Sequence, residues 1–271
     1  MRLINRKPGP VTATALGVLP FLILLMIYGL ASQQRLADNP NDKLLPGLEQ
    51  MAQAVDRMAF QEDRRSGDVL MWVDTIASLE RLGMGVGIAA VMALVVGLVN
   101  GVLPLVRAHL SPLVSALSMV PPLAILPILF IVFGLGELSK VMLIVIGTAP
   151  IMMRDVAQRV RELPSEQLIK IQTLGANSWQ VITRMALPQV LPRLIDAVRL
   201  SLGPAWLFLI AAEAIASTEG LGYRIFLVRR YLAMDVILPY VIWITVLAIV
   251  IDQCLRYTNR RLFPWYNAGG H

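Results

Sequence analysis

Long apolar runs without a charged residue recur along this chain, and they constrain its fold more than any other feature. A helix of roughly 20 apolar residues crosses the hydrocarbon core of a bilayer and satisfies its own backbone hydrogen bonds. Several runs reach that length, and the shorter ones have charged residues near their ends. We therefore expect about six membrane-spanning helices, at residues 11–31, 82–106, 110–135, 141–153, 197–215 and 236–251.

The composition excludes the main alternatives to a membrane protein. Hydrophobic residues make up 56% of the chain and charged residues 15%, whereas soluble domains have about 45–50% and about 25%. A single cysteine, Cys254, excludes an intrachain disulfide scaffold. The net charge of +6 is typical of lysine and arginine at the cytoplasmic ends of spans and indicates no nucleic-acid partner. The sequence thus predicts an all-α, polytopic membrane protein embedded in the lipid bilayer.

Polar stretches divide the chain into four parts. The first apolar stretch has about 21 residues, longer than the roughly 7–15 of a signal peptide, so we favour an uncleaved anchor over a cleaved signal. In the next part Leu48, Met51 and Val55 recur at helical spacing and predict a short amphipathic helix. The parts are a cytoplasmic N-terminus with a first transmembrane anchor (1–31), an extracytoplasmic loop (32–75), a transmembrane core (76–255) and a cytoplasmic tail (256–271).

The distribution of lysine and arginine predicts which side of the membrane each loop faces. We counted these residues for six spans with both termini inside. The inner segments 1–10, 107–109, 154–193 and 252–271 carry 3, 1, 6 and 3 of them. The outer segments 32–75, 136–140 and 217–235 carry 5, 1 and 3. The excess on the inner side predicts a multi-pass protein with both termini in the cytoplasm.

Prolines interrupt the third expected span. Pro121 and Pro122 remove two backbone donors near its centre, and a proline disfavours helix at the residue before it. Backbone that is not helical at this depth is tolerated only where it is buried in protein or faces a water-filled cavity. We therefore expect a broken helix beside a cavity.

The sequence contains no motif for catalysis. It has no Gly-x-x-x-x-Gly-Lys-Ser/Thr phosphate loop, no Gly-x-Ser-x-Gly elbow, no His-Glu-x-x-His pair and no histidine or cysteine cluster for a metal. Asp155, Asp196, Glu213 and Asp252 each lie at the end of a span, where a structural role is favoured. Glu213 is the strongest functional candidate among them.

The polar loop at residues 161–193 has signals for two short helices. Ser165 is placed to cap the first helix, and Gly175 to end it with a positive φ. Asn177 or Ser178 can cap the second helix, which Pro188 would end. Two short helices at an angle would form a knob that another protein can bind. An ordinary amphipathic loop is the alternative interpretation.

This loop resembles the coupling loop of binding-protein-dependent ABC importer permeases. The matching runs are Leu-Gly-Ala-Asn-Ser-Trp at 174–179 and Ala-Leu-Pro-Gln-Val-Leu-Pro at 186–192, with the family's spacing of thirteen residues between Gly175 and Pro188. More narrowly, the chain is similar to the nitrate, sulfonate, taurine and bicarbonate (NitT/TauT) group. Further segments that carry this similarity are 118–127, 133–136, 199–206, 212–213 and 220–223.

The resemblance implies a fold, an assembly and a function. The last five spans would form a type-I permease core, to which the first span is added. The permease would form a dimer, expected to be a homodimer, with two cytoplasmic ATP-binding subunits and an extracytoplasmic solute-binding protein. ATP and Mg²⁺ would bind to the ATPase subunits, and this chain would need no cofactor. The complex would import a small polar, anionic solute such as nitrate, a sulfonate or taurine across the bacterial inner membrane by alternating access.

The resemblance gives one set of expected site residues, and the proline break with the candidate carboxylate Glu213 gives a second. Those expected to couple to the ATPase are Glu166, Leu174, Gly175, Ala176, Asn177, Trp179 and Pro188. Those expected to line the translocation path are Ser118, Met119, Pro121, Pro122 and Glu213.

The loop departs from the family pattern at one point. The family's Glu-Ala-Ala is expected six to four residues before the glycine, where this chain has Ile169, Lys170 and Ile171. The nearest carboxylate, Glu166, lies about one helical turn earlier. Glu166 either replaces the missing carboxylate or only stabilises the N-terminal end of its own helix.

A membrane-embedded enzyme and a membrane scaffold are the alternative functions. An enzyme would need reactive groups that face one cavity, and the sequence shows only isolated carboxylates. A scaffold would not need broken, proline-rich spans. We therefore expect a transporter subunit that is not an enzyme.

Overall fold

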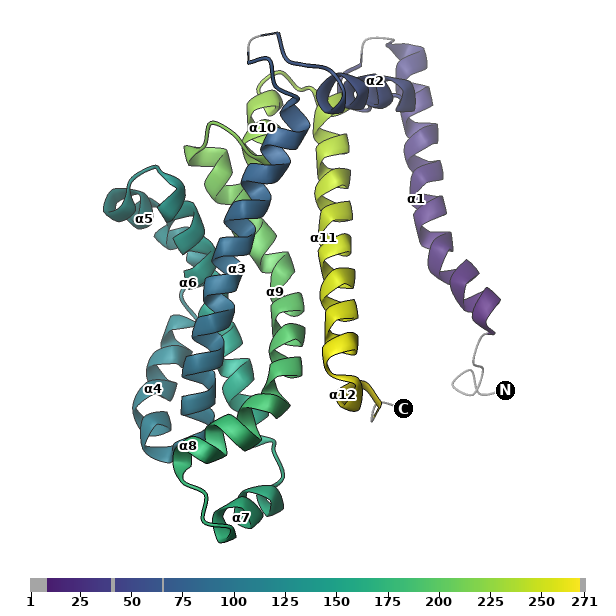
Figure 1. Ribbon diagram of the computed structural model, residues 1–271. Coiled ribbons are helices and arrows are strands. Elements are labelled where there is room, and N and C mark those ends of the chain that lie inside the picture. Colours follow the sequence, from purple (N-terminus) through teal and green to yellow (C-terminus); the bar gives the residue numbers. More distant parts are fainter. Residues whose placement is uncertain (1–8, 40–41, 65, 269–271) are drawn as a thin grey trace. The chain divides into compact units, whose positions relative to one another are not determined.

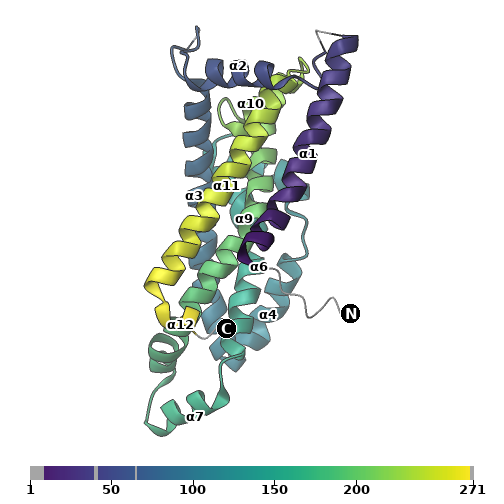
Figure 2. The same cartoon turned by 90° about the vertical axis from the view of Figure 1, so that its right-hand side faces the viewer.

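The computed structural model describes residues 9–39, 42–64 and 66–268, and these residues form helices and no strands. The chain divides into two compact units: unit 1 comprises Met1–Val69 and Val228–Val241, and unit 2 comprises Leu70–Leu227 and Ile242–His271. Figures 1 and 2 show the helices, and Figure 1 labels those numbered α1 to α12. They are α1 (Pro10–Asp38), α2 (Leu48–Ala59), α3 (Leu70–Val102), α4 (Pro104–Leu117), η2 (Pro122–Ile125), α5 (Leu126–Phe133), α6 (Glu137–Arg161), α7 (Ser165–Thr173), α8 (Ser178–Gln180), η3 (Val181–Ala186), α9 (Leu187–Ala216), α10 (Leu221–Arg229), α11 (Met234–Leu262) and α12 (Pro264–Ala268).

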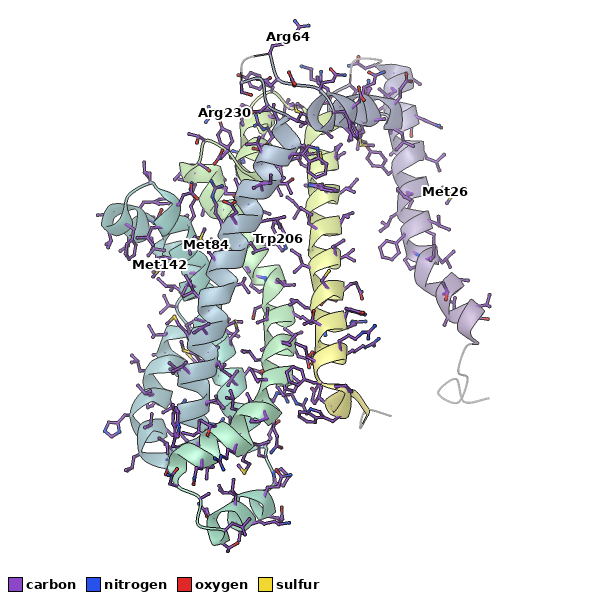
Figure 3. The ribbon with its side chains drawn as sticks, viewed as in Figure 1. Met26, Arg64, Met84, Met142, Trp206 and Arg230 are labelled. Carbon is purple, nitrogen blue, oxygen red and sulfur yellow. The ribbon has the colours of Figure 1, made fainter. Side chains whose placement is uncertain are left out.

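Unit 1 contains one long apolar helix and one short amphipathic helix. Apolar side chains such as Met26 are exposed along α1 (Figure 3), as expected of a helix that faces lipid. The Tyr28 hydroxyl donates to the Pro46 carbonyl oxygen at 2.7 Å, and the Ser32 hydroxyl donates to the Leu45 carbonyl oxygen at 3.0 Å. These bonds join the end of α1 to the segment before α2. The predicted amphipathic helix is confirmed as α2.

Unit 2 is built on two parallel helices, α3 and α6, that lie side by side (Figure 1). Gly85 of α3 faces Ile144 of α6, and Gly101 faces Val160, so that both pairs are separated by 59 residues. A constant offset along both helices means that they run in the same direction. Glycine at these contacts lets the two backbones approach closely, which is a common device in membrane proteins.

The connection between these parallel helices must return the chain to the end where α3 begins. It consists of α4, followed by η2 with α5, and the two parts are bent by 80°. The predicted break at Pro121 and Pro122 is confirmed, because the missing proline N–H groups end α4 and a short 3₁₀ turn begins after Pro121. The expected broken span over residues 110–135 is thus a bent pair that begins at Pro104 and ends at Phe133. The described residues contain five helices that could span a membrane, or six spans with this bent pair.

The helix that contains α9 begins earlier than the sequence indicates. It runs without interruption from α8 through the π-helical segment η3 into α9, a length of 39 residues. Pro188 was expected to end a helix, and this prediction is wrong, because Pro188 lies in the first turn of α9. A proline ring normally clashes with the carbonyl group four residues earlier. The wider π turn directly before Pro188 accommodates the ring and lets the helix continue.

Polar contacts hold the later part of α11 to α9. The Arg199 guanidinium donates to Asp252 at 2.8 Å, and the Asn259 amide donates to the Pro192 carbonyl oxygen at 3.1 Å. Near the start of the same segment, the Trp243 indole N–H donates to the Thr75 hydroxyl at 2.9 Å. These contacts place the two ends of this part of α11 beside the start of α3 and the start of α9.

The boundary between the first two structural parts differs from the predicted one at residues 75–76. The helix α3 begins at Leu70, and unit 1 also takes up residues 228–241. In the sequence, polar residues such as Asp74 indicate a loop before the second span. The Asp74 carboxylate is instead fully buried and accepts a hydrogen bond from Arg224 at 2.8 Å, so this polar position lies inside a helix.

Candidate functional site

Unit 2 has candidate sites at its two ends and at the break after α4. Figure 1 shows α7 at the end of unit 2 that is farthest from α10, and Figure 2 agrees. The end with α7 carries the residues expected to couple to an ATPase. The other end carries a buried cluster of charged side chains.

The loop around Gly175 has the predicted backbone geometry. Gly175 follows α7 with a φ of +80°, a conformation that glycine adopts without strain. The Asn177 side chain accepts a hydrogen bond from the Gln180 N–H at 2.9 Å, and the Gln180 side chain accepts one from the Asn177 N–H at 2.9 Å. This reciprocal capping confirms Asn177 as the cap of the second helix. The cap predicted at Ser165 is wrong, because Pro164 occupies the N-cap position and its fixed φ suits a helix start.

Large apolar side chains are exposed on this loop, and three of them are more than half exposed. The exposed fraction is 60% for Ile169, 78% for Leu174 and 70% for Trp179. Solvent-exposed apolar side chains grouped on one loop, with tryptophan among them, are typical of a protein–protein contact. The smaller Ala176 lies between the last two and is half-buried.

Polar contacts and a cavity connect the loop to the helices behind it. The Gln189 side-chain amide of α9 donates to the side-chain oxygen Oε1 of Gln167 of α7 at 2.9 Å. A cavity of about 330 Å³ lies between α3, α4, α6, α7 and η3, and Val160, Leu168 and Met185 are among the residues that line it. Glu166 is exposed and forms no ion pair with the residues that the structure describes. Its carboxylate is therefore available to a partner protein.

At the opposite end of unit 2, Glu213 is fully buried and has three hydrogen-bond donors around its carboxylate. Its carboxylate accepts hydrogen bonds from the Arg81 guanidinium, the Ser78 hydroxyl and the Gly222 backbone N–H, each at 2.8 Å. Arg81 also donates to Glu137 at 2.9 Å, which joins α3, α6 and α9. These are the contacts of a structural ion pair, and they give no support to a role for Glu213 in lining a path.

The same cluster fixes the loop after α9. The Gly220 N–H donates to Asp74 at 2.9 Å, and Asp74 also pairs with Arg224 at 2.8 Å. Gly220 has a φ of +121°, and a Cβ atom at this position would lie 2.5 Å from the Glu213 carboxylate. Glycine is therefore required here both by the backbone and by the packing.

Sequence reasoning missed Asp74 and Arg81 as members of this cluster. Each is a charged residue at the start of an otherwise apolar helix, and it could equally well have been hydrated at the membrane surface. The sequence did contain a signal. A charged residue that is buried at the start of an apolar run needs a partner of opposite charge, and that partner can lie far away in the sequence. That partner could not be identified from hydropathy.

The break between α4 and η2 exposes some of the residues expected on a path. Met119 is 76% exposed, and Pro121 is exposed as well. The Ser118 hydroxyl accepts a hydrogen bond from the Arg154 guanidinium of α6 at 2.8 Å. Pro122 begins the 3₁₀ turn and is half-buried.

The structure does not bring Glu213 together with this break. Glu213 and its partner Arg81 lie at the start of α6, where Arg81 contacts Glu137. Ser118 contacts Arg154, which lies 17 positions further along the same helix. That separation corresponds to roughly 25 Å at 1.5 Å per residue. The two parts of the predicted path set are therefore separate.

The four carboxylates at span ends all pair with arginine, as a structural role requires. Besides Glu213, these pairs are Asp155 with Arg159 at 3.5 Å, Asp196 with Arg199 at 3.2 Å and Asp252 with Arg199 at 2.8 Å. Within residues 9–39, 42–64 and 66–268, no group of three or more histidine, cysteine, aspartate or glutamate residues could hold a metal ion.

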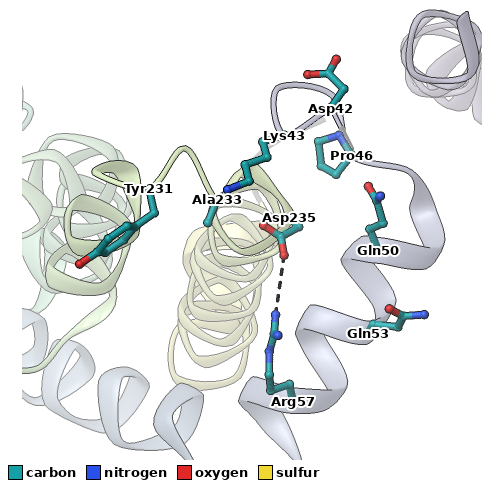
Figure 4. A pocket seen from close by; sticks show the side chains of 9 residues that line it. All are labelled: Asp42, Lys43, Pro46, Gln50, Gln53, Arg57, Tyr231, Ala233 and Asp235. Carbon is teal, nitrogen blue, oxygen red and sulfur yellow. Dashed lines mark ion pairs between the residues drawn. The ribbon is translucent and has the colours of Figure 1, made fainter. Parts of the chain in front are cut away.

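Unit 1 contains a polar cavity of about 480 Å³ between α2 and the start of α11 (Figure 4). Arg57 of α2 points toward Asp235 of α11, and their nearest charged atoms are 3.7 Å apart. Lys43 and Asp42 also contribute to its lining. Positive and negative charges are balanced in number among these four side chains.

Comparison with known proteins identifies relatives over most of the chain. Residues 84–264 match the family described as "Binding-protein-dependent transport system inner membrane component". The taurine transport system permease protein TauC of Escherichia coli (strain K12) is 37% identical over 200 residues, which cover 73% of this chain and 72% of TauC. The bicarbonate transport system permease protein CmpB of Synechococcus elongatus is 28% identical over 251 residues, which cover 90% of this chain and 86% of CmpB. The putative aliphatic sulfonates transport permease protein SsuC of Bacillus subtilis (strain 168) is 29% identical over 211 residues, which cover 78% of this chain and 76% of SsuC.

Solved structures share the fold. A chain of the MetNI methionine ABC transporter in an inward-facing conformation superposes with a TM-score of 0.59 at 21% identity and covers 71% of this chain and 95% of that one. A chain of a bacterial ABC transporter involved in the import of the acidic polysaccharide alginate superposes with a TM-score of 0.64 at 14% identity, with 93% of each chain covered. At these identities the likeness concerns the fold alone.

Proposed function

Because this chain belongs to the family of binding-protein-dependent transport system inner membrane components, we propose a solute class, an assembly and a coupling surface for it. The chain is a permease subunit of an ABC importer, is not an enzyme, and crosses the inner membrane several times. The single observation that carries this function is the family match over residues 84–264, which includes the whole Gly175 loop.

The solute that we propose is a small oxyanion. Relatives named for taurine, aliphatic sulfonates and bicarbonate support this class, because each of these solutes carries a sulfonate or carbonate group. The test is uptake by vesicles that contain the complete importer and its own solute-binding protein. Taurine, an alkanesulfonate, bicarbonate and nitrate serve as substrates, and an uncharged sugar serves as the control. Uptake of the sugar without uptake of any anion would refute the proposal.

The proposed assembly is two copies of this chain, two ATP-binding subunits in the cytoplasm and one solute-binding protein outside. This chain would hold no cofactor, and ATP with Mg²⁺ would bind to the ATPase subunits. Residues 76–255 would form the transport core, and residues 1–31 an added anchor. Mass measurement of the detergent-purified complex tests the stoichiometry, and a complex with a second, different permease would exclude the homodimer.

Both termini are proposed to lie in the cytoplasm. Support for the C-terminal end comes from α11, which runs from Trp243 beside Thr75 to Asn259 beside Pro192. Pro192 lies near the start of α9 and therefore near the Gly175 loop, which must face the ATPase subunits. The chain end after α11 would then share their side of the membrane. Protease protection of tags at each terminus in sealed inside-out vesicles tests this orientation.

The coupling surface that we propose is the exposed apolar group Ile169, Leu174 and Trp179. In place of the family's Glu-Ala-Ala this chain has Ile169, Lys170 and Ile171, so apolar burial would supply much of the contact with the ATPase. The residues expected to position this surface are those of the turn and of the following helix start, Gly175, Ala176, Asn177 and Pro188. ATP-driven movement of the ATPase would displace this loop, and α9, which continues from it, would transmit the movement to the spans.

Substitution of Trp179 tests this surface. Trp179→Ser should reduce co-purification of the ATPase and uptake together, because interface tryptophans contribute about 2 kcal/mol or more to binding. Ile215→Ser is the matched control, since Ile215 is also exposed (68%) but lies at the opposite end of unit 2. An equal loss of ATPase from both variants would refute the assignment.

The translocation path is proposed to pass the break at Ser118, Met119, Pro121 and Pro122. The exposure of Met119 and the interrupted helix support this position, because unpaired backbone in a membrane must face protein or water. The path would open alternately to the two sides as the ATPase binds and hydrolyses ATP. Glu213 is also expected on the path from the sequence, but its burial favours a role in holding the bundle together.

A further inference from the structure

Arg154 of α6 differs from three other arginines in the membrane-spanning helices of unit 2. Arg81, Arg159 and Arg199 each form an ion pair with a carboxylate. Arg154 forms no such pair with the residues that the structure describes, and its side chain is exposed. The partner that it does have is a neutral hydroxyl, Ser118 Oγ, at 2.8 Å.

An arginine without a counter-ion has a restricted choice of surroundings in a membrane. The free energy of a charged side chain against hydrocarbon is so unfavourable that such residues face a water-filled cavity, a headgroup or another protein group. Arg154 lies next to the place in unit 2 where a spanning pair is bent by 80°. Exposed Met119 follows Ser118 directly, so Arg154 and the break share one surface.

We propose that Arg154, with Ser118, is a contact site for the oxyanion group of the transported solute as it passes the broken helix. This inference rests on the proposed path at residues 118–122 and adds the residue that would recognise the charge. A guanidinium has five N–H donors in a planar fork, and Ser118 occupies one of its nitrogens. The free donors match two oxygens of a sulfonate, carbonate or nitrate group.

The surrounding charges keep this site positive. Asp155 is the next residue, but neighbouring positions on a helix do not share a face. The Asp155 carboxylate is moreover engaged with Arg159 at 3.5 Å. The Ser118 hydroxyl donates to the Ser115 carbonyl oxygen at 2.8 Å, which aims its oxygen lone pairs at Arg154. No acidic side chain in the described part of the chain forms an ion pair with Arg154.

A lipid phosphate could use the same chemistry. Arg154 lies seven residues before the end of α6, or about 10 Å, and long side chains can extend to the headgroups. A phosphate-bound Arg154 would lie against lipid, whereas a path-lining Arg154 would lie against water. Accessibility of a neighbouring cysteine to reagents of opposite charge separates the two arrangements.

The test uses Met119→Cys in a Cys254→Ala background, in the complete importer in membrane vesicles. The reaction rates of an anionic and a cationic methanethiosulfonate of similar size are compared. Arg154→Gln should lower the ratio of anionic to cationic rate several-fold at low ionic strength, because one nearby positive charge attracts the anionic reagent and repels the cationic one. Arg154→Lys should keep most of the ratio. Arg260→Gln, which removes an exposed cation from α11, should leave it unchanged.

Inorganic sulfate is the probe for oxyanion binding. At matched ionic strength, sulfate should slow the reaction of the thiol introduced at position 119 several-fold more than chloride does. This protection should be lost in Arg154→Gln, weakened in Ser118→Ala and only partly kept in Arg154→Lys, because an ammonium lacks the planar fork. Elution of the intact complex on size exclusion verifies that each variant is assembled.

Each failure has a separate meaning. An introduced thiol that reacts only after the lipid is removed would overturn the path at residues 118–122 and would favour a lipid phosphate. A reactive thiol whose rate ratio is insensitive to Arg154 would leave the path in place and overturn this inference. A charge effect without protection by sulfate would also overturn it, since no oxyanion would then be bound.

Discussion

The Glu213 carboxylate accepts a hydrogen bond from the Arg81 guanidinium at 2.8 Å although 132 positions separate the two residues, and both side chains are buried. Transfer of two charges out of water costs several kcal/mol for each ion, and their attraction offsets this cost only while both are present. The pair joins α3 to α9. We therefore expect removal of both charges to reduce the stability of the protein less than removal of one of them does.

Removal of one partner should show this dependence. Arg81→Met should destabilise unit 2 by about 3–5 kcal/mol, because Glu213 is left buried without its cation. The double variant Arg81→Met with Glu213→Leu should recover part of that loss. The measurement is the midpoint of thermal unfolding of the detergent-purified complex. A double variant that unfolds at a lower temperature than the single one would contradict this reasoning.

The contact between α3 and α6 predicts a second difference between similar variants. A Cβ atom on Gly97 would lie 2.6 Å from Val156 Cγ1, whereas a Cβ atom on Gly87 would meet nothing within 4 Å. Gly97→Ala should therefore destabilise the protein by about 1–3 kcal/mol through overpacking. Gly87→Ala should leave stability unchanged or raise it by up to about 1 kcal/mol, because alanine favours helix. Equal melting temperatures for the two variants would contradict the close approach of these helices.

Gly175 provides a test of coupling that does not depend on packing. Its φ is +80°, and a Cβ atom there would meet nothing within 4 Å, so only the backbone conformation is affected by a side chain. Gly175→Val should preserve insertion and abolish most uptake, since a β-branched residue is strained at positive φ. Gly175→Asn should keep more activity, because asparagine tolerates this conformation. Wild-type uptake by Gly175→Val would show that this turn is not needed for coupling.

Glu166 offers a test of electrostatic contact with the ATPase. Glu166→Gln should weaken co-purification of the ATPase at low salt and have less effect at high salt, where an ion pair is already screened. Glu62→Gln is the control, because Glu62 is exposed in the proposed extracytoplasmic loop. Unchanged ATPase binding at low salt would leave Glu166 with only the role of stabilising the start of α7, where the helix dipole favours an acid.

Features that depend on neighbours in sequence could be predicted from the sequence. The amphipathic α2, the positive φ of Gly175, the cap at Asn177 and the break before Pro122 follow from residue spacing and from the backbone properties of glycine, asparagine and proline. Ser165 and Pro188 show the limit of this reasoning. The N-cap of α7 is Pro164 and not Ser165. A π turn before Pro188 allows the helix to continue where the proline was expected to end it.

The sequence by itself determined the membrane class, the positions of most spans and the resemblance to a known permease family, because hydropathy and local motifs depend on residues that are close together in the chain. Only the tertiary structure decided that α3 and α6 are parallel, that Glu213 pairs with Arg81, and that Arg154 meets Ser118 instead of a carboxylate. The physical reason is that a charge in an apolar helix requires a partner or water, but its own sequence does not specify which. That choice is made when helices pack, since packing determines which faces meet and at what depth.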